Sequence, residues 1–390
     1  MAAGTVFPSF QAALEYLFKL GEKEKIILAI DEYPYVAKSS SSLASTLQLL
    51  IDKYKDSTKL KLILCGSSMS YMEDEVLAYK SPLYGRRTAQ LKISPFEFSE
   101  ICKSFSNFSD EDKALIYGVV GGTPQYLLQI DENNSMSENI KNIYLNPISF
   151  LYEEPVNLLK QEVREPALYM AIITAIANGT AKMSEIANKV GEPTSVCSSY
   201  LKSLIGLGIV KKETPYGEET SKKVLYEIED NMFRFWYRFV LENNSLIERG
   251  GAEIVYKRIE PYFPEYMGKV FEEICKQYLW NKMITGECPV IFNSIGRWWG
   301  NNPKTRVQEE IDIMGAQDKS TALFGECKWT NEDVDLSVLD KLIERSHLFN
   351  YKNIFYYIFA KKGFTLGCKE KAYKMGNVKL ISFGDLMKNI

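Results

Sequence analysis

The sequence predicts an α/β protein of several domains, and three observations support this fold class. Two continuously apolar runs, at residues 25–30 and 61–65, flank a helical stretch at about 43–55. A strand–helix–strand order with apolar strands is typical of a buried parallel sheet. Three helical stretches and two strands around a polar turn follow within residues 166–228. A last α/β region begins at about residue 266, and 390 residues exceed what one hydrophobic core organises.

The composition is that of an ordinary globular protein, with 46% hydrophobic and 25% charged residues. The net charge of −3 provides no general basic field, so any contact with nucleic acid must rest on local patches. Seven cysteines without a C-x-x-C pair and a single histidine disfavour a zinc site and histidine-based catalysis. The chain has neither an apolar stretch of membrane-spanning length nor a signal-peptide pattern, which predicts a cytoplasmic protein with reduced thiols and no membrane partner.

The first part of the chain combines strands with helices. Helical spacing at residues 9–20 precedes the strand at 25–30, and a third short strand is predicted at Ala89–Ile93. From Pro95 to about residue 160 the pattern is helical, with a break at Gly121-Gly122-Thr123-Pro124.

Asp31-Glu32 directly follows the first strand, which is the Walker B arrangement. In that arrangement the Asp holds Mg²⁺ and the Glu polarises the attacking water. The phosphate-binding loop G-x-x-x-x-G-K-[ST] is not found, because the one Gly-Lys pair, Gly268-Lys269, is followed by Val270. We therefore expect a chain that begins inside a larger ATPase and does not bind ATP tightly by itself.

Two further positions fit a nucleotide site. Ser67 or Ser68, at the tip of the second strand, lies where a sensor residue would contact the γ-phosphate. Arg86-Arg87 is placed on a loop from which an arginine reaches a neighbouring subunit's phosphates. An ordinary surface ion pair is the alternative for these arginines.

Residues 166–228 have the order of a winged helix-turn-helix, with three helices and a hairpin. The third helix is poor in base-reading side chains, and the wing carries four lysines, Lys211, Lys212, Lys222 and Lys223. DNA binding and protein packing both remain open for this module. The aromatic-rich segment 231–244 is interpreted as packing between domains rather than as a platform for bases.

Four segments together resemble a known family: IDEYPYV, LILCGSSMSYM, SPLYGRRTAQLKISPFEF and GGTPQYL. They are similar to archaeal and bacterial AAA+ ATPases of the STAND-related group, which are P-loop proteins with a C-terminal restriction-endonuclease-like domain. The resemblance implies ATP and Mg²⁺ as cofactors and a helical lid that starts at Gly121. It also implies site roles: Asp31 as Mg²⁺ ligand, Glu32 as catalytic glutamate, Ser67 or Ser68 as sensor, and Arg86 or Arg87 as arginine finger.

A second constellation lies near the C-terminus. Asp312 is on one predicted strand, and Glu326 and Lys328 are on the next, two residues apart and therefore on one face. Two carboxylates that converge bind Mg²⁺, and a lysine beside them can orient a water. Glu272 on an upstream helix adds an acidic residue, with Glu273 as the alternate. This order is the signature of PD-(D/E)XK nucleases; the alternatives are an exposed hairpin with an ion pair, or the same fold with an inactive site.

The sequence thus predicts a truncated P-loop AAA+ core with helical lid, a winged helix-turn-helix and a restriction-endonuclease-like α/β domain. The expected boundaries are 1–160 for the ATPase core and lid, 161–230 for the winged helix, 231–265 for a helical linker and 266–390 for the nuclease-like domain. The expected function is that of an ATPase-family protein acting on or near nucleic acid. The alternative is a non-enzymatic regulatory or interaction protein, whose partner is another protein or a second copy of the chain.

Overall fold

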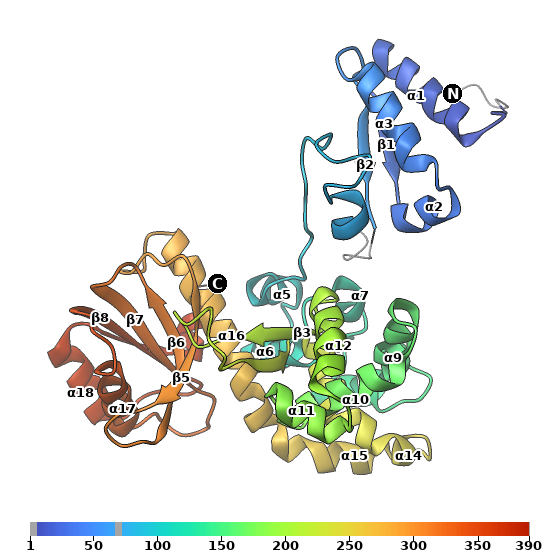
Figure 1. The fold of residues 1–390 in the computed structure, drawn as a ribbon. Helices are drawn as coiled ribbons and strands as arrows, with labels where there is room; N and C mark the ends of the chain where they lie inside the picture. Colours follow the sequence, from blue (N-terminus) through green and yellow to red (C-terminus); the bar gives the residue numbers. More distant parts are fainter. Residues whose placement is uncertain (1–5, 67–71, 390) are drawn as a thin grey trace. The chain divides into compact units, whose positions relative to one another are not determined.

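The structure is a computed structural model that describes residues 6–66 and 72–389, apart from the side chain at position 74. The chain forms two compact units, Met1–Ile93 and Ser94–Ile390 (Figure 1). The helices predicted within residues 95–160 therefore pack in the second unit. The finer division into four domains stays a prediction.

The first unit is built around two short parallel strands. Its elements are α1 (Phe10–Lys23), β1 (Ile27–Ile30), α2 (Tyr33–Ser39), α3 (Leu43–Tyr54), β2 (Lys61–Leu64) and the π-helix η1 (Met72–Val76). β1 and β2 pair in parallel from Ile27↔Lys61 to Ile30↔Leu64. The strand–helix–strand prediction is confirmed in its parallel pairing.

The sheet of the first unit is covered on one face only. Leu14 of α1 and Leu47 of α3 are buried with Ile30 in one apolar core. On the strands, Ile27 is 71% exposed and Ile63 is 48% exposed. The expectation of a sheet buried on both faces was therefore wrong within the described residues, because α1 and α3 supply only one covering layer.

The third strand predicted at Ala89–Ile93 is also wrong. These residues carry no strand assignment, and Leu91 and Ile93 are 85% and 87% exposed. An apolar run becomes a strand only where a neighbouring strand supplies ladder hydrogen bonds, and this segment has none in the described structure.

The second unit begins with helices that share one core. They are α5 (Phe98–Ser104), α6 (Asp110–Val120), α7 (Pro124–Leu127), α8 (Met136–Tyr144) and α9 (Phe150–Glu162). There follow α10 (Pro166–Ala177), α11 (Met183–Val190), α12 (Thr194–Gly206) and the antiparallel strands β3 (Val210–Glu213) and β4 (Leu225–Ile228). Ile116, Ile140, Ile172 and Leu204 from this region belong to a single buried cluster.

The aromatic-rich segment is buried at the centre of this cluster. The segment forms α13 (Asn231–Phe235), the π-helix η2 (Trp236–Val240) and the 3₁₀-helix η3 (Leu241–Asn243). Phe235 is fully buried, Trp236 is 1% exposed, and the Trp236 indole N–H donates to the carbonyl oxygen of Tyr152 at 2.7 Å. These side chains therefore pack inside the unit and offer no exposed face to bases.

The chain then leads into a five-stranded sheet. The linking elements are α14 (Asn244–Ile247), α15 (Ala252–Ile259), η4 (Glu260–Tyr262) and the long helix α16 (Phe263–Ile284). The sheet and its helices are β5 (Ile295–Asn301), β6 (Gln308–Ala316), β7 (Thr321–Lys328), α17 (Leu336–Ser346), β8 (Asn353–Ala360), α18 (Leu366–Met375), β9 (Val378–Ser382) and α19 (Phe383–Met387).

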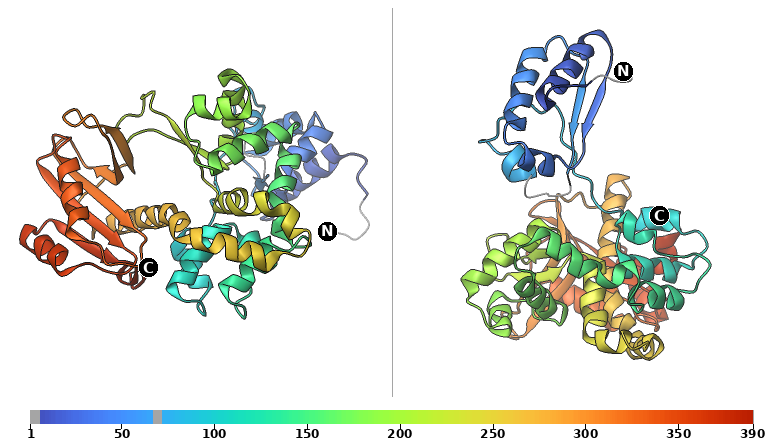
Figure 2. Two further views of the ribbon diagram at one scale, coloured as in Figure 1. Left: turned by 90° about the horizontal axis from the view of Figure 1, so that it is seen from below. Right: turned by 90° about the vertical axis from the view of Figure 1, so that its right-hand side faces the viewer.

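The sheet is mixed and is covered on both faces. Its order is β5-β6-β7-β8-β9, antiparallel from β5 to β7 and parallel from β7 to β9. Helix α16 packs on one face and α17 on the other, as Figures 1 and 2 show. The α/β class is confirmed. No described helix combines the length and apolar character needed to cross a bilayer.

Gly122, within the Gly-Gly-Thr-Pro segment, fixes a close approach of two backbone segments. Its carbonyl oxygen accepts a hydrogen bond from the Phe96 N–H at 2.9 Å. A Cβ atom at this position would lie 2.0 Å from the carbonyl oxygen of Phe96. Only glycine lets the segment after α6 approach the segment before α5 this closely.

We expect Gly122→Ala to destabilise the protein by about 2–4 kcal/mol, because backbone atoms must move to relieve the clash. Gly206→Ala, at the end of α12, is the matched control, since nothing lies within 4 Å of the added methyl group. Urea unfolding followed by circular dichroism measures both variants. Equal stability of the two would contradict the tight contact at Gly122.

Candidate functional site

The candidate site lies where β6 departs from its regular pairing. β6 pairs with β7 from Ala316↔Ala322 to Ile313↔Gly325, and its pairing with β5 shifts between Gly296 and Trp298. Asp312 has no partner in either register of these described strands. Instead, its carboxylate oxygen Oδ2 accepts a hydrogen bond from the Cys327 N–H at 2.8 Å. The carboxylate thus takes the donor that a regular ladder would have used.

Glu326 lies next to Asp312 across the two strands. The register of β6 and β7, continued by one pair, would bring Glu326 opposite Asp312. Glu326 Oε1 accepts from Lys328 Nζ at 2.7 Å, and its Oε2 lies 3.4 Å from Nη1 of Arg345 on α17. Both Asp312 and Glu326 are buried, at 9% and 6% exposure.

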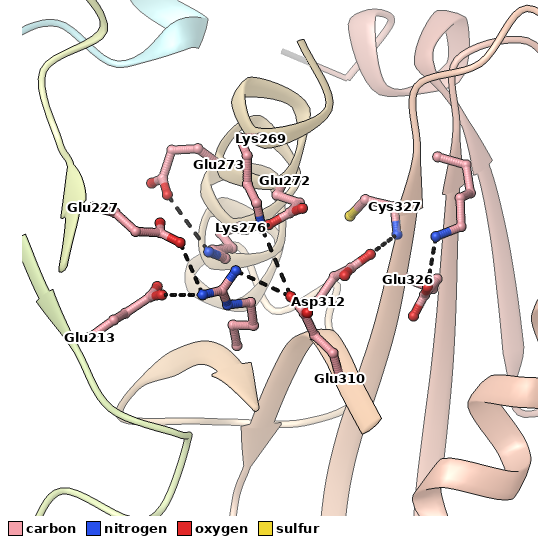
Figure 3. Close-up of polar contacts among 12 residues, drawn as sticks. Glu213, Glu227, Lys269, Glu272, Glu273, Lys276, Glu310, Asp312, Glu326 and Cys327 are labelled. Carbon is pink, nitrogen blue, oxygen red and sulfur yellow. Dashed lines mark hydrogen bonds and ion pairs between the residues drawn. The ribbon is translucent and has the colours of Figure 1, made fainter. Parts of the chain in front are cut away.

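Glu272 reaches the same region from helix α16. Its Oε2 lies 3.1 Å from Nζ of Lys269, one helical turn earlier. Lys269 Nζ also lies 3.9 Å from Glu310 on β6. Figure 3 shows Glu272 and Asp312 side by side, with Lys269 and Glu310 between the helix and the sheet.

The electrostatics show that these carboxylates share one crowded environment. Burial raises the pKa of Glu272 to about 7, and the charge of Asp312 adds to this rise while Lys269 opposes it. Burial, followed by the charge of Glu326, raises the pKa of Asp312 to about 6. For Lys328, burial lowers the pKa, but the charges of Glu326 and Asp312 outweigh burial and raise it. Lys328 is therefore a stable cation in the site.

The structure brings together the four residues expected at the C-terminal site, but does not arrange them as a closed ligand set. Within residues 6–66 and 72–389, no group of three or more acidic, Cys or His side chains is placed to hold a metal ion. A cavity of about 290 Å³ lies beside helix α16. Its lining includes Lys269 and Glu227 but not Glu272, Asp312, Glu326 or Lys328.

Several polar residues of this region had not been predicted from the sequence. Arg345, Glu310, Lys269 and Arg297 each contact the acidic residues or each other through ion pairs. Each pair except that of Lys269 with Glu272 joins separate elements of the fold. An i,i+3 spacing could have indicated that pair, while the others depend on tertiary packing.

The nucleotide half-site in the first unit has an unusual backbone. Asp31 follows β1, and its Oδ1 accepts from the Glu32 N–H at 2.9 Å and lies 3.4 Å from the Cys65 sulfur. Glu32 has a φ of 48°, in the left-handed region, at the start of α2. Non-glycine residues rarely adopt this conformation, and it turns Glu32 out of the strand direction. The predicted sensors Ser67 and Ser68 lie outside the described residues.

Arg86 forms a two-point ion pair with Asp52 of α3. Its Nε and Nη2 atoms lie 2.8 and 2.7 Å from the two carboxylate oxygens, and its Nη1 donates to the carbonyl oxygens of Pro82 and Tyr84. Arg87 donates to the side chain of Gln90 at 2.7 Å. Within the first unit, Arg86 therefore forms the ordinary ion pair that was the alternative to an arginine finger. A role on a neighbouring subunit's phosphates stays a prediction.

Two family models match the chain. A model of an ATPase domain predominantly from Archaea matches residues 3–130, and a model of archaeal and bacterial proteins of unknown function matches residues 236–339. The second range contains all four residues of the C-terminal candidate site.

A curated relative and a solved structure are among the proteins that are similar to the chain. The uncharacterized protein MJECL04 of Methanocaldococcus jannaschii is 38% identical over 311 residues, which cover 79% of this chain and 68% of that protein. The crystal structure of protein VC1899 from Vibrio cholerae covers 97% of this chain and 94% of that chain, at 12% identity and a TM-score of 0.26. A score this low carries no argument about the fold.

The raised pKa of Glu272 makes stability depend on pH. The folded state retains the proton that the unfolded chain releases near pH 4, so this carboxyl stabilises the fold at low pH. The contribution is lost as the pH rises toward the folded pKa of about 7. We expect Glu272→Gln to gain about 2–3 kcal/mol of unfolding free energy relative to wild type between pH 4.5 and about pH 8.

Urea unfolding at a series of pH values measures this difference. Glu273→Gln is the matched control, because the Glu273 side chain is 43% exposed on the same helix. This control should follow the wild-type pH dependence. If the unfolding free energies of Glu272→Gln and wild type varied in parallel with pH, the raised pKa of Glu272 would be contradicted.

Proposed function

The chain belongs to the family of proteins with an ATPase domain found predominantly in Archaea, and we propose that it combines an ATPase-type nucleotide site with Mg²⁺-dependent cleavage of nucleic acid. The nucleotide part belongs to residues 3–130, where Asp31 and Glu32 follow β1. The cleavage part belongs to the five-stranded sheet and α16. In the finer assignment that the sequence motifs favour, this is a STAND-related AAA+ protein with a restriction-endonuclease-like C-terminal domain.

The observation that carries the nuclease proposal is the position of Asp312. Its carboxylate is buried at an irregularity of β6, beside Glu326. Lys328 Nζ donates to Oε1 of Glu326 at 2.7 Å. A buried strand that interrupts its ladder to place a carboxylate next to another loses hydrogen bonds and adds charge repulsion. Features of this kind are concentrated at functional sites.

The chemistry of the donor atoms suits a hard divalent cation, although their spacing in this structure does not form a closed ligand set. Asp312 and Glu326, with Glu272 in support, would hold Mg²⁺ through carboxylate oxygens, and Mg²⁺ usually keeps several of its waters. When bound, the ion supplies an activated water and charge stabilisation at the phosphate. The raised pKa values of Glu272 and Asp312 support this proposal, because a cation would offset both the burial and the charge repulsion that raise them.

Each side chain has a distinct role in this proposal. Lys328 keeps its proton, so it stabilises negative charge that develops on the phosphate and does not act as a base. Arg345 holds the second oxygen of Glu326 at 3.4 Å and so orients that carboxylate. Lys269 compensates part of the charge of Glu272 from 3.1 Å.

Nucleic acid is the proposed partner, and α10–α12 with β3 and β4 are proposed to be a winged helix. Three of the wing lysines predicted from the sequence, Lys212, Lys222 and Lys223, are exposed. Lys211 lies instead 3.6 Å from Glu213 and 3.9 Å from Glu227. The wing thus keeps cations that can contact phosphates.

For the nucleotide site, we expect the 390-residue chain to show no micromolar affinity for ATP-Mg²⁺. Asp31 offers a metal ligand, but the backbone N–H cradle and lysine of a phosphate loop provide most contacts to the β- and γ-phosphates. Isothermal titration calorimetry measures the affinity, and Glu32→Gln should leave it unchanged. A micromolar dissociation constant, or ATP hydrolysis abolished by Glu32→Gln, would contradict this expectation.

For the C-terminal site, we expect cleavage of single- or double-stranded DNA or RNA in Mg²⁺ or Mn²⁺. Asp312→Asn should reduce the rate at least about 100-fold, because a ligand of the ion is lost. Glu332→Gln, an exposed carboxylate after β7, is the control and should retain the rate. Gel assays with labelled oligonucleotides measure cleavage.

The same variants also separate metal binding from catalysis. Saturating Mg²⁺ should stabilise wild type by about 1–3 kcal/mol in thermal unfolding, and Asp312→Asn should lose this gain. A metal-dependent shift without cleavage of any substrate would support the non-enzymatic interaction protein instead. Equal shifts in wild type and Asp312→Asn would refute the metal site.

A further inference from the structure

Arg297 on β5 is a buried cation surrounded by three carboxylates. Its side chain is 8% exposed. Nη2 lies 2.9 Å from Glu227 and 3.2 Å from Glu213, and Nη1 lies 3.2 Å from Glu310. Glu213 and Glu227 belong to the β3–β4 hairpin, whereas Glu310 belongs to the sheet. The guanidinium therefore joins the hairpin to the sheet.

Glu227 of the hairpin is ionised in this position. Burial raises the pKa of Glu227, but the charge of Arg297 and then that of Lys211 outweigh burial and lower it to about 2. Two carboxylates against one guanidinium present several anionic oxygens to it, as a phosphate group would. Arginine binds both groups through the same N–H donors.

The pairing around Arg297 is incomplete. In the described structure, the buried Nε of Arg297 and the buried Oε2 of Glu213 have no hydrogen-bond partner, although Oε2 lies within ion-pair distance of Nη2. Buried donors are normally satisfied, and an orphan one calls for an explanation. The guanidinium thus retains one N–H donor for a group that the hairpin does not provide.

The loop of the hairpin contacts the sheet through polar groups and through the Tyr216 side chain, which also packs against an apolar cluster of the sheet. The Tyr216 N–H donates to the Arg297 carbonyl oxygen at 2.9 Å, and the Tyr216 hydroxyl accepts from the Ala316 N–H at 2.8 Å. Hydrogen bonds of this kind exchange for hydrogen bonds with water at small net cost, whereas the buried ion pairs of Arg297 exchange without a large cost only for those of another anion. An anion that displaces the hairpin from this contact must therefore neutralise Arg297 in its place.

We propose that Arg297 is a binding residue for a nucleic-acid phosphate, and that Glu213 and Glu227 of the hairpin mask it as internal phosphate substitutes. Displacement of the hairpin frees the guanidinium for the backbone of DNA or RNA. This inference rests on the proposed function, since nucleic acid is the ligand of the neighbouring acidic site.

The masked residue is connected to that acidic site. Glu310, which Arg297 contacts at 3.2 Å, also lies 3.9 Å from Lys269, and Lys269 lies 3.1 Å from Glu272. Arg297 sits at the shift in the β5–β6 register, beside the point where Asp312 leaves the ladder. A phosphate held by Arg297 would place the adjoining backbone of the nucleic acid next to Asp312.

Binding of labelled oligonucleotides, measured in EDTA so that no cleavage occurs, tests whether Glu213 and Glu227 block phosphate binding by Arg297. Fluorescence anisotropy at about 150 mM salt should show that Glu213→Gln with Glu227→Gln binds single- or double-stranded DNA or RNA about tenfold more tightly than wild type, which corresponds to one good charge-assisted contact. Glu219→Gln with Glu229→Gln changes the charge equally at exposed hairpin positions. This control should stay within about twofold of wild type, since it adds only diffuse charge.

Arg297→Gln added to the double variant should remove the gain. A gain that survives Arg297→Gln, or that the exposed control reproduces, overturns the proposal. If the double variant fails to fold, Tyr216→Phe decides, because it loosens the hairpin without changing charge and should also raise affinity. An unchanged affinity of folded Tyr216→Phe overturns the proposal in that case.

Two further arms separate the alternatives. Calorimetry with inorganic pyrophosphate distinguishes a small-phosphate site, and tight binding of pyrophosphate without oligonucleotide binding overturns the nucleic-acid assignment. Cleavage is measured separately with Mg²⁺. A gain in affinity without cleavage supports the mask at Arg297 and contradicts only the nuclease proposal.

Discussion

A buried guanidinium must be neutralised where it lies, and this constraint organises the C-terminal half of the molecule. Leaving Arg297 unpaired would cost several kcal/mol, on the order of 3–5. Its three carboxylate partners come from β3, β4 and β6, so the hairpin, the sheet and, through Lys269, helix α16 are held in one arrangement. The position of the hairpin on the sheet is therefore an electrostatic requirement as much as a result of apolar packing.

The same region concentrates irregularity in the sheet. The register of β5 shifts at Arg297, and Asp312 on β6 bonds to a backbone N–H through its side chain. A register shift redirects side chains, here a cation toward the hairpin and a carboxylate toward Glu326. Charge, backbone irregularity and burial coincide within a few residues, which is the combination expected of a site that acts on a charged ligand.

Strand periodicity made much of the acidic site predictable. The two-residue spacing of Glu326 and Lys328 indicated a shared face, and the ion pair at 2.7 Å agrees with it. The α/β class and the parallel pairing of β1 with β2 also followed from apolar runs. The strand predicted at Ala89–Ile93 failed because an apolar run shows strand preference but not the presence of a neighbouring strand to pair with.

Most of the ion-pair partners that the sequence did not reveal are distant in the chain. Arg86 pairs with Asp52, 34 positions earlier, and Arg297 pairs with Glu227, 70 positions earlier. Local spacing determines the face on which a side chain lies, but the fold determines which charge it meets there. Arg297 shows the consequence, because a lone arginine in an apolar strand carries no motif, yet its burial among carboxylates makes it the link between the hairpin and the acidic site.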